Sequence, residues 1–247
     1  LGLDKILSAQ HPRSEPEEHD EHLFIVIHQV YELWFKQLLH ELDHLHALLV
    51  DGFTDRSGAV LNRMLKIMKT IVAQIDVLET MTPLDFLSFR SFLEDASGFQ
   101  SVQFRETEFA LGYKRRNIVD ALEGTPGWER LAVRYEAPSL WDAFLELLIG
   151  AGYDVEPRPD VTQPVQPNPA VQDVLLDMYR NNVRLRRVAE NLLDLDEGLQ
   201  EWRYRHVKMV ERTIGRKPGT GGSEGTAYLR TTLNPAFPDL WEIRSRL

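Results

Sequence analysis

The sequence predicts an all-α fold, a helical bundle of long helices forming a single domain over residues 1–247. Apolar residues recur at three- and four-residue spacing along nearly the whole chain, which is the period of one helix face. No convincing run alternates apolar and polar residues, and no Asn-Gly or Asp-Gly turn joins two such runs. With 43% hydrophobic residues, a chain of this length can bury a large core.

The first half of the chain contains two of the long apolar-periodic segments. We expect one helix at about residues 20–50, ended by Gly52, and a second at about 59–80. Thr82 and Pro83 then supply the N-cap and the first-turn proline of a short helix. Another helix is expected to begin near Val102.

The second half is divided by a proline-rich connection. Smaller helices are expected at about 118–122 and 139–148. Five prolines between Pro157 and Pro169 exclude a helix there, and because both flanks have the same helical character, we prefer a crossover within one bundle to a domain boundary. Two long helices at about 171–193 and 197–214 follow, and then a glycine-rich loop at 215–225.

Composition narrows the class of partner. The chain carries 28 Lys and Arg against 38 Asp and Glu, a net charge of −10, which argues against a nucleic-acid or anionic-lipid partner and suits a zwitterionic one. No cysteine is present, so any metal must be held by His, Asp or Glu. No apolar run approaches the roughly 20 residues that span a membrane, and no signal peptide is recognisable, so we expect a cytoplasmic protein.

Among the eight histidines, those of the first long helix offer one motif of di-iron bundles. Glu41 and His44 have the Glu-x-x-His spacing, but such sites need a second copy of it, and none is present. Since His44 and His46 lie among charged residues, a solvated face is the better interpretation.

Two other histidines stand in apolar surroundings. His28 follows Phe24 by one turn in an aromatic stretch, and it is either a core histidine bonded to a backbone carbonyl or a histidine facing an apolar pocket. His206 lies on an apolar stripe, and a single helix imidazole is enough to hold haem iron with its other face open. Arg203, Arg205 and other cations near His206 are either solvated or placed to meet haem propionates.

Arg90 lies among three phenylalanines in the sequence. It pairs with a structural carboxylate, Asp85 or Glu94, or it receives a ligand carboxylate in bidentate geometry. The loop at 215–225 lacks the Gly-Lys-Ser/Thr ending and the preceding strand of a nucleotide-binding loop. It is either a flexible surface loop or a backbone segment that approaches a ligand closely.

Four segments together resemble the tryptophan 2,3-dioxygenase family. They are Phe24-Ile-Val-Ile-His28-Gln-Val-Tyr-Glu-Leu-Trp-Phe-Lys-Gln, Ser97-Gly-Phe-Gln-Ser-Val-Gln-Phe-Arg105, Trp202-Arg-Tyr-Arg-His206 and Gly219-Thr-Gly-Gly-Ser223. They occur in the family's order, and the resemblance covers nearly the whole chain. It implies that the bundle encloses a haem pocket.

The resemblance also implies roles for single residues. His206 would be the axial ligand of the haem iron, with Ser97 near the haem edge, and His28 would hydrogen-bond the indole N–H of the substrate. The residues that would contact the substrate are Phe24, Ile25, Val26, Ile27, His28, Phe86, Arg90, Leu93 and Thr220. Of these, Arg90 would take the substrate carboxylate. Glu224 stands where many family members have serine, and members also have two tyrosines preceding the segment that matches Leu1.

The activity implied is insertion of O₂ across the indole C2–C3 bond of L-tryptophan, which gives N-formyl-L-kynurenine and begins the kynurenine pathway. The implied cofactor is haem b, ferrous in the active form, and the implied assembly is a homotetramer. We favour orientation of the indole by His28 over proton abstraction, because the indole N–H is too weakly acidic for a near-neutral imidazole. The alternatives are a helical haem sensor or carrier and, less favoured, a non-haem di-iron bundle.

Overall fold

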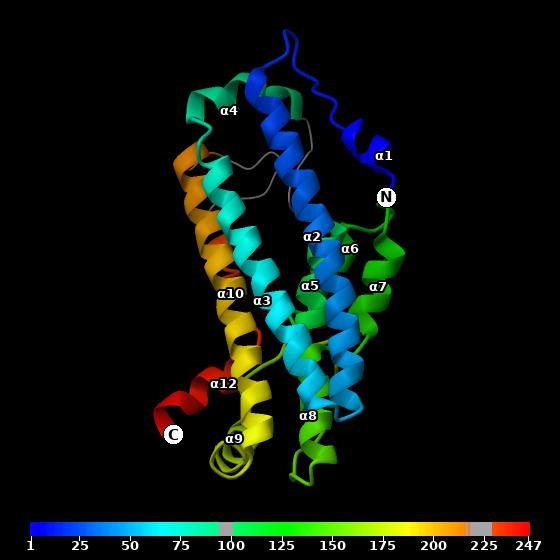
Figure 1. Ribbon diagram of the computed structural model, residues 1–247, viewed down its shortest axis with the longest axis vertical. Helices are drawn as coiled ribbons and strands as arrows, with labels where there is room; N and C mark the ends of the chain where they lie inside the picture. The colour runs from blue at the N-terminus through cyan, green and yellow to red at the C-terminus, as the bar shows by residue number, and fades with distance from the viewer. Residues whose placement is uncertain (94–100, 216, 218–228) are drawn as a thin grey trace. The chain divides into compact units, whose positions relative to one another are not determined.

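The computed structural model describes residues 1–93, 101–215, 217 and 229–247, and this part of the chain contains helices and no strand (Figure 1). The all-α fold class is therefore confirmed for the described residues. The elements are α1 (Leu3–Leu7), α2 (His19–Val50), α3 (Thr54–Leu78), α4 (Pro83–Phe89), η1 (Arg90–Leu93), α5 (Val102–Leu111), α6 (Arg116–Ala121), α7 (Trp128–Glu136), α8 (Leu140–Gly150), α9 (Pro169–Asn181), α10 (Val183–Ile214), α12 (Pro238–Glu242) and η3 (Ile243–Arg246).

The helices expected in the first half are present with small shifts. α2 ends before Gly52, whose φ of 77° permits the turn into α3. α3 begins at Thr54, five residues before the expected start, because Gly58 lies inside the helix instead of preceding it. α4 has the expected N-cap: the Thr82 side chain accepts from the N–H of Asp85, and the Asp85 carboxylate accepts from the N–H of Thr82.

The expected break between the two long helices of the second half is wrong. We expected it near residues 194–196, but α9 ends at Asn181 and α10 then runs without interruption to Ile214. The break is at Asn182, whose extended backbone interrupts the helix and whose side-chain oxygen accepts from the N–H of Leu185 as a cap. Gly198 lies inside α10, and the Met68 side chain packs against the position that a Cβ atom would take at this residue.

The helices α1, α7 and α12 were not expected from the sequence. α7 ends against a buried lysine: the Lys114 ammonium donates to the carbonyls of Arg134, Tyr135 and Ala137 at 2.7–3.0 Å. These belong to the end of the helix, where carbonyls lack helical partners. Lys114, some twenty residues earlier in the chain, thus helps to end α7, a helix whose own apolar pattern is too short to predict it.

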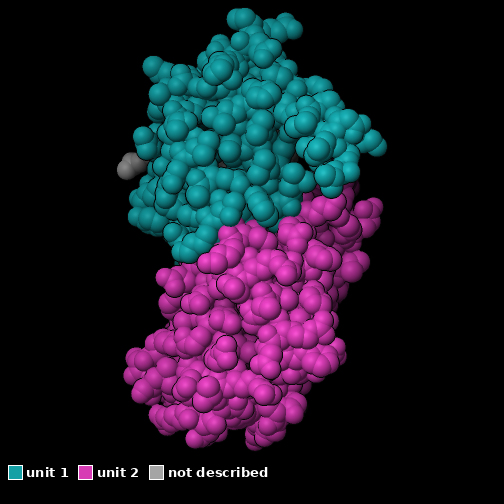
Figure 2. All heavy atoms as spheres, in the orientation of Figure 1, with its two compact units in different colours: residues 1–34, 69–101, 201–233 teal, residues 35–68, 102–200, 234–247 magenta. Residues whose placement is uncertain are grey.

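The chain forms two compact units, shown in different colours in Figure 2. Unit 1 comprises residues 1–34, 69–101 and 201–233, and unit 2 comprises residues 35–68, 102–200 and 234–247. The proline-rich stretch at 157–169 is helix-free up to Pro169, the first residue of α9, as expected, and it lies within unit 2.

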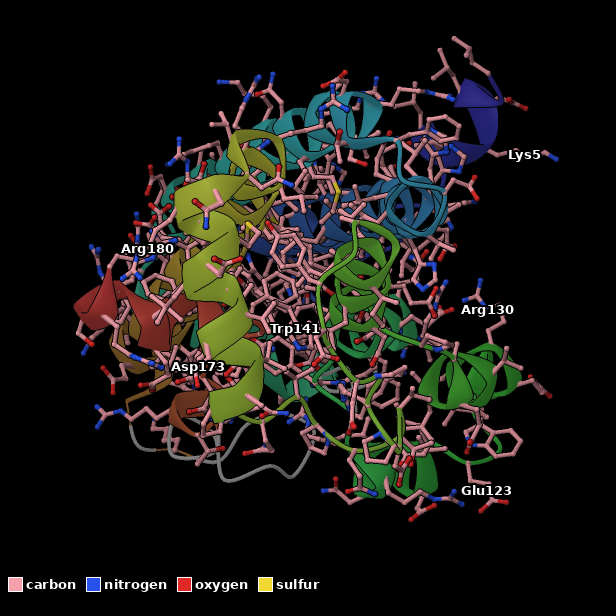
Figure 3. The ribbon with its side chains drawn as sticks, turned by 90° about the horizontal axis from the view of Figure 1, so that it is seen from below. Lys5, Glu123, Arg130, Trp141, Asp173 and Arg180 are labelled. Atoms are coloured by element: carbon pink, nitrogen blue, oxygen red, sulfur yellow. The ribbon has the colours of Figure 1, made fainter. Side chains whose placement is uncertain are left out.

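Unit 2 is built around large buried rings. Trp141 of α8 stacks on Phe237 with ring centroids 5.7 Å apart, and both are almost fully buried. Figure 3 shows Trp141 among packed side chains, whereas Glu123 and Arg130 lie at the edge of the same unit. The C-terminal segment is held by the buried Asp196 carboxylate, which accepts bonds from two backbone N–H groups and the Trp241 indole.

Three long helices contribute their ends to unit 1, and their directions follow from cross-contacts. α2 and α3 are antiparallel, since they are joined by a three-residue turn and the Tyr31 hydroxyl of α2 donates to the carbonyl of Ile71 in α3. α3 and α10 are parallel, because Lys69 pairs with Glu201 and, further along both helices, Asp76 pairs with Arg205. α2 and α10 are therefore antiparallel, as Figure 1 shows.

No helix among the described residues is both long enough and apolar enough to cross a membrane.

Candidate active site

An aromatic cluster in unit 1 joins the start of α2 to α4. The Phe24 ring lies 5.8 Å from Phe86 and 5.6 Å from Phe89, and these two lie 5.5 Å apart, all between ring centroids. The two α4 rings are buried and Phe24 is partly exposed. Tilted and edge-on rings at these separations are favourable, so the cluster presents a firm apolar wall.

His28 continues this cluster on α2. Its ring lies 4.0 Å from that of Phe24, and its Nδ1 is 2.7 Å from the Phe24 carbonyl oxygen. A carbonyl can only accept, so Nδ1 carries the proton and donates it. Burial lowers the pKa of His28, although the Phe24 carbonyl and the Glu32 charge oppose that shift. The ring is therefore neutral at pH 7, and Nε2 is an unprotonated acceptor.

The surroundings of His28 combine two properties. Protein atoms surround the ring closely enough for burial to lower its pKa, yet a large part of the residue is accessible to solvent. Of the two interpretations of His28, the bond to a backbone carbonyl is present. Whether the exposed part of the ring faces a ligand stays a prediction.

Arg90 and Leu93 follow the aromatic cluster in the chain. Arg90 is the residue after α4 and the first of η1, and it is partly exposed, while Leu93 ends η1 and is buried. The Asp85 carboxylate, one possible partner of Arg90, accepts bonds from the Thr82 N–H and hydroxyl, and Glu94 lies outside the described residues. Arg90 therefore directly follows Phe89, the last phenylalanine of the cluster, in the chain.

His206 lies on α10, one turn beyond Trp202. The two rings are stacked, with centroids 5.4 Å apart and planes 11° apart. Trp202 is buried and His206 is partly exposed. The Tyr31 ring of α2 meets Trp202 edge-on at 6.2 Å.

This contact relates the two histidines. His28 precedes Tyr31 by three residues, and His206 follows Trp202 by four. Because α2 and α10 are antiparallel, His28 and His206 lie on the same side of the Tyr31–Trp202 contact, each about one helical turn from it.

The cations around His206 have partners in the protein. Arg205 pairs with Asp76 at 2.6 Å and Glu79 at 3.3 Å, and Lys208 pairs with Glu211. The Arg203 guanidinium is buried and donates to the carbonyl of Thr232. Arg205 and Arg203 thus connect α10 to other segments of unit 1, while the Lys208 pair lies within α10.

The other histidines of α2 do not form a metal site in the described part of the chain, which contains no group of three or more potential ligands. The Glu41 carboxylate is bound by Arg63 at 2.9 Å, and His40 and His44 are exposed, as the solvated-face interpretation requires. His46 differs: it is half-buried, its pKa is lowered by burial, and its Nε2 has no hydrogen-bond partner.

The remaining predicted residues are not joined to the cluster by observed contacts. Ile25 and Val26 are partly exposed and Ile27 is buried, and helix geometry directs Ile25 and Val26 away from the face of Phe24 and His28. Ser97, Thr220 and Glu224 lie outside the described residues.

The sequence did not identify Phe89 and Tyr31 as residues of the site. Helical spacing contained the signal for both, since Phe89 follows Phe86 by three residues and Tyr31 follows His28 by three.

Fold and site define a class: an all-α protein whose aromatic cluster carries a neutral histidine able to accept an N–H donor, with an arginine next in the chain after the cluster. Comparison with known proteins gives the family. The family model for tryptophan 2,3-dioxygenase matches residues 1–149 and 168–247. The chain belongs to the tryptophan 2,3-dioxygenase family.

Individual relatives agree with this assignment over the full chain. It is 58% identical to the tryptophan 2,3-dioxygenase of Herpetosiphon aurantiacus, with 100% of this chain and 96% of the relative aligned. It is 57% identical to the enzyme of an Anaeromyxobacter strain, with 94% of that relative aligned. The Pseudomonas fluorescens enzyme is 42% identical, again over 100% of this chain.

Proposed function

We propose that this chain is a haem-dependent enzyme that inserts both atoms of O₂ across the indole C2–C3 bond of L-tryptophan. The product is N-formyl-L-kynurenine, and the reaction begins the kynurenine pathway. Family membership gives the reaction class. The observation that carries the substrate assignment is the neutral His28 ring, whose free Nε2 accepts an N–H donor beside an aromatic wall.

The donor set fits haem b. Haem needs one axial protein ligand, and His206 supplies a helix imidazole that is partly exposed and stacked on a buried indole. A bare metal ion would need several ligands, and the described residues contain no such group. His206 is therefore our axial ligand, and Ser97, which lies outside the described residues, is our residue at the haem edge.

When bound, ferrous haem supplies the activation of dioxygen. The protein supplies position. Nε2 of His28 accepts the indole N–H and thereby fixes the ring's rotation. Phe24 and Phe86 hold the ring plane, and their apolar surface keeps water away. Such positioning can lower a barrier by several kcal/mol.

The amino-acid end of the substrate is assigned to two residues. Arg90 binds the carboxylate in bidentate geometry, the arrangement in which arginine surpasses lysine. Thr220, outside the described residues, contacts the ammonium and carboxylate end. Leu93 and Ile27 complete the lining in this proposal, whereas Ile25 and Val26 lie on another face of α2 and are not assigned a contact with the substrate.

The test is one reaction with a matched variant. Anaerobically reduced, haem-loaded protein is mixed with O₂ and L-tryptophan, and formation of formylkynurenine is followed by its near-ultraviolet absorbance. We expect product from the wild type, and loss of the haem absorbance band in His206→Ala with its helical content preserved. Haem uptake without product would favour a sensor or carrier, and an unchanged haem spectrum in His206→Ala would refute the ligand.

On the basis of family membership we also propose that the protein is a homotetramer and that it is cytoplasmic. Light scattering coupled to size-exclusion chromatography tests the first, and fractionation of cells that express the chain tests the second.

A further inference from the structure

The His206 imidazole is held by a ring contact. An imidazole on a helix can turn about two side-chain bonds, so a metal ligand needs a neighbour that fixes its plane. Trp202, one turn earlier on α10, provides a flat surface nearly parallel to it, 11° from coplanar and 5.4 Å between centroids. An offset stack of this kind restrains both tilt and rotation of the smaller ring.

Trp202 is itself restrained from a second helix. Its side chain is buried, and Tyr31 of α2 meets it edge-on at 6.2 Å. The Tyr31 hydroxyl donates to the Ile71 carbonyl of α3 at 3.1 Å. Burial raises the pKa of Tyr31 to about 12, so the hydroxyl keeps the proton that it donates throughout the neutral range.

The backbone on either side of Trp202 and His206 is anchored as well. The buried guanidinium of Arg203 donates to the carbonyl of Thr232 at 2.6 Å, and Arg205 binds Asp76 of α3. These contacts restrain the rotation of this turn of α10 about its axis. On this turn the Trp202 indole faces the His206 ring, so the stack acts on a segment of helix that is already anchored.

We infer that Trp202, held by Tyr31, is a positioning residue that orients the His206 imidazole for axial ligation of haem iron. This inference rests on the proposed function, because it requires His206 to be the ligand. Contacts of this outer kind orient many metal-binding histidines, and the stacked indole is such a contact for His206. Tyr31 acts through Trp202 and is the outer member of the pair.

Two readouts test it, neither of which is turnover. Apoprotein is loaded with haem b, and the rate of haem transfer to an excess of a haem-scavenging globin is measured. The iron–histidine stretching vibration of the reduced protein is then recorded by resonance Raman spectroscopy. Removing outer contacts of a metal ligand typically weakens metal binding about 10–100-fold, so Trp202→Leu should release haem at least about tenfold faster and shift or broaden that vibration.

Conservative and control variants separate positioning from general stability. Trp202→Phe retains a ring that can stack on His206, so its rate of haem release should stay within about threefold of the wild-type rate. Leu199→Ala removes a buried side chain from the same helix, seven residues before His206, and it should lower the unfolding temperature while leaving the vibration unchanged. If Trp202→Leu does not fold, Tyr31→Leu replaces it in the test. Tyr31→Leu should then shift or broaden the iron–histidine vibration relative to the wild type.

The outcomes are distinguishable. Equal haem release and an unchanged vibration in Trp202→Leu and Leu199→Ala would overturn the positioning role while leaving His206 as the ligand. The same holds if Trp202→Leu fails to fold and Tyr31→Leu leaves the vibration unchanged. Retention of haem with an unchanged spectrum in His206→Ala would instead overturn the proposed ligand, and the positioning role with it.

Discussion

At the residue scale, the tautomer of His28 decides what that side chain can do. Its Nδ1 donates to the Phe24 carbonyl, and its lowered pKa keeps Nε2 free to accept. A neutral hydrogen bond contributes about 1 kcal/mol, so His28→Ala should lower kcat/KM for L-tryptophan by about fivefold if the ring only orients the indole. Complete loss of turnover with tryptophan binding intact would favour proton abstraction.

The same residue predicts a pH dependence. Protonation places a proton on Nε2 and converts the acceptor into a donor, so kcat/KM should fall as the pH drops through the pKa of His28, which burial places below its usual 6.5. Above that value the profile should be flat with respect to this group. A His28→Ala profile should lack the acidic limb, and retention of the limb in that variant would assign the titration to another group.

Arg90 should decide the recognition of the carboxylate. A site that pairs a buried polar group of the substrate can reject an analogue lacking it by roughly 10⁴-fold, so tryptamine should be a very poor substrate. Arg90→Ala should mainly raise KM for tryptophan and bring the kcat/KM values of tryptophan and tryptamine together. Arg116→Ala, which removes an exposed arginine paired with Asp120, serves as the control. Comparable turnover of both compounds by the wild type would refute the assignment.

At the scale of elements, the cap of α4 positions the aromatic wall. Losing such a cap costs enough to lower the unfolding midpoint of a chain this size by about 2–4 °C, so we expect that shift in Thr82→Ala together with a higher KM. Thr82→Ser retains the hydroxyl and should behave as the wild type. The equivalent box of α8 is more deeply buried, with Ser139 at 0% and Asp142 at 8% exposure, so Ser139→Ala should be more destabilising and should leave KM unchanged. Reversed effects on KM would contradict this account.

The cap of α7 predicts how stability depends on pH. Burial lowers the pKa of Lys114 from 10.5 to about 8, so between these values the unfolded chain holds a proton that the folded protein has released. The free energy of unfolding should therefore rise with pH across this window, by about 3 kcal/mol relative to a Lys114→Met variant. Urea denaturation of both proteins at several pH values checks it. Parallel curves for the two proteins would show that Lys114 does not titrate there.

Elements were predictable where local signals were strong. The Thr82-Pro83 start of α4 and the proline-rich connection follow from backbone chemistry alone. The break at Asn182 was not predicted, because asparagine between two apolar-periodic segments is a weak local signal. Its role as a cap depends on the bond from the N–H of Leu185, which only the structure shows.

At the scale of the whole molecule, the site depends on contacts between distant segments. Spacing could place His28 beside Phe24, but it could not show that the Phe24 carbonyl fixes the tautomer. Spacing also could not show that Trp202 contacts Tyr31, because that contact depends on how α2 and α10 each pack against α3. The roles of single residues came from the family resemblance, which the full-length relatives now support for the reaction class.

The central claim is that this chain places both atoms of one dioxygen molecule in the product. The most direct measurement is turnover of L-tryptophan by the reduced, haem-loaded protein under isotopically heavy dioxygen in ordinary water, with mass analysis of the product at early times. We predict formylkynurenine that carries two heavy oxygen atoms. A product carrying one heavy atom or none, or haem binding with no conversion of tryptophan, would contradict the account.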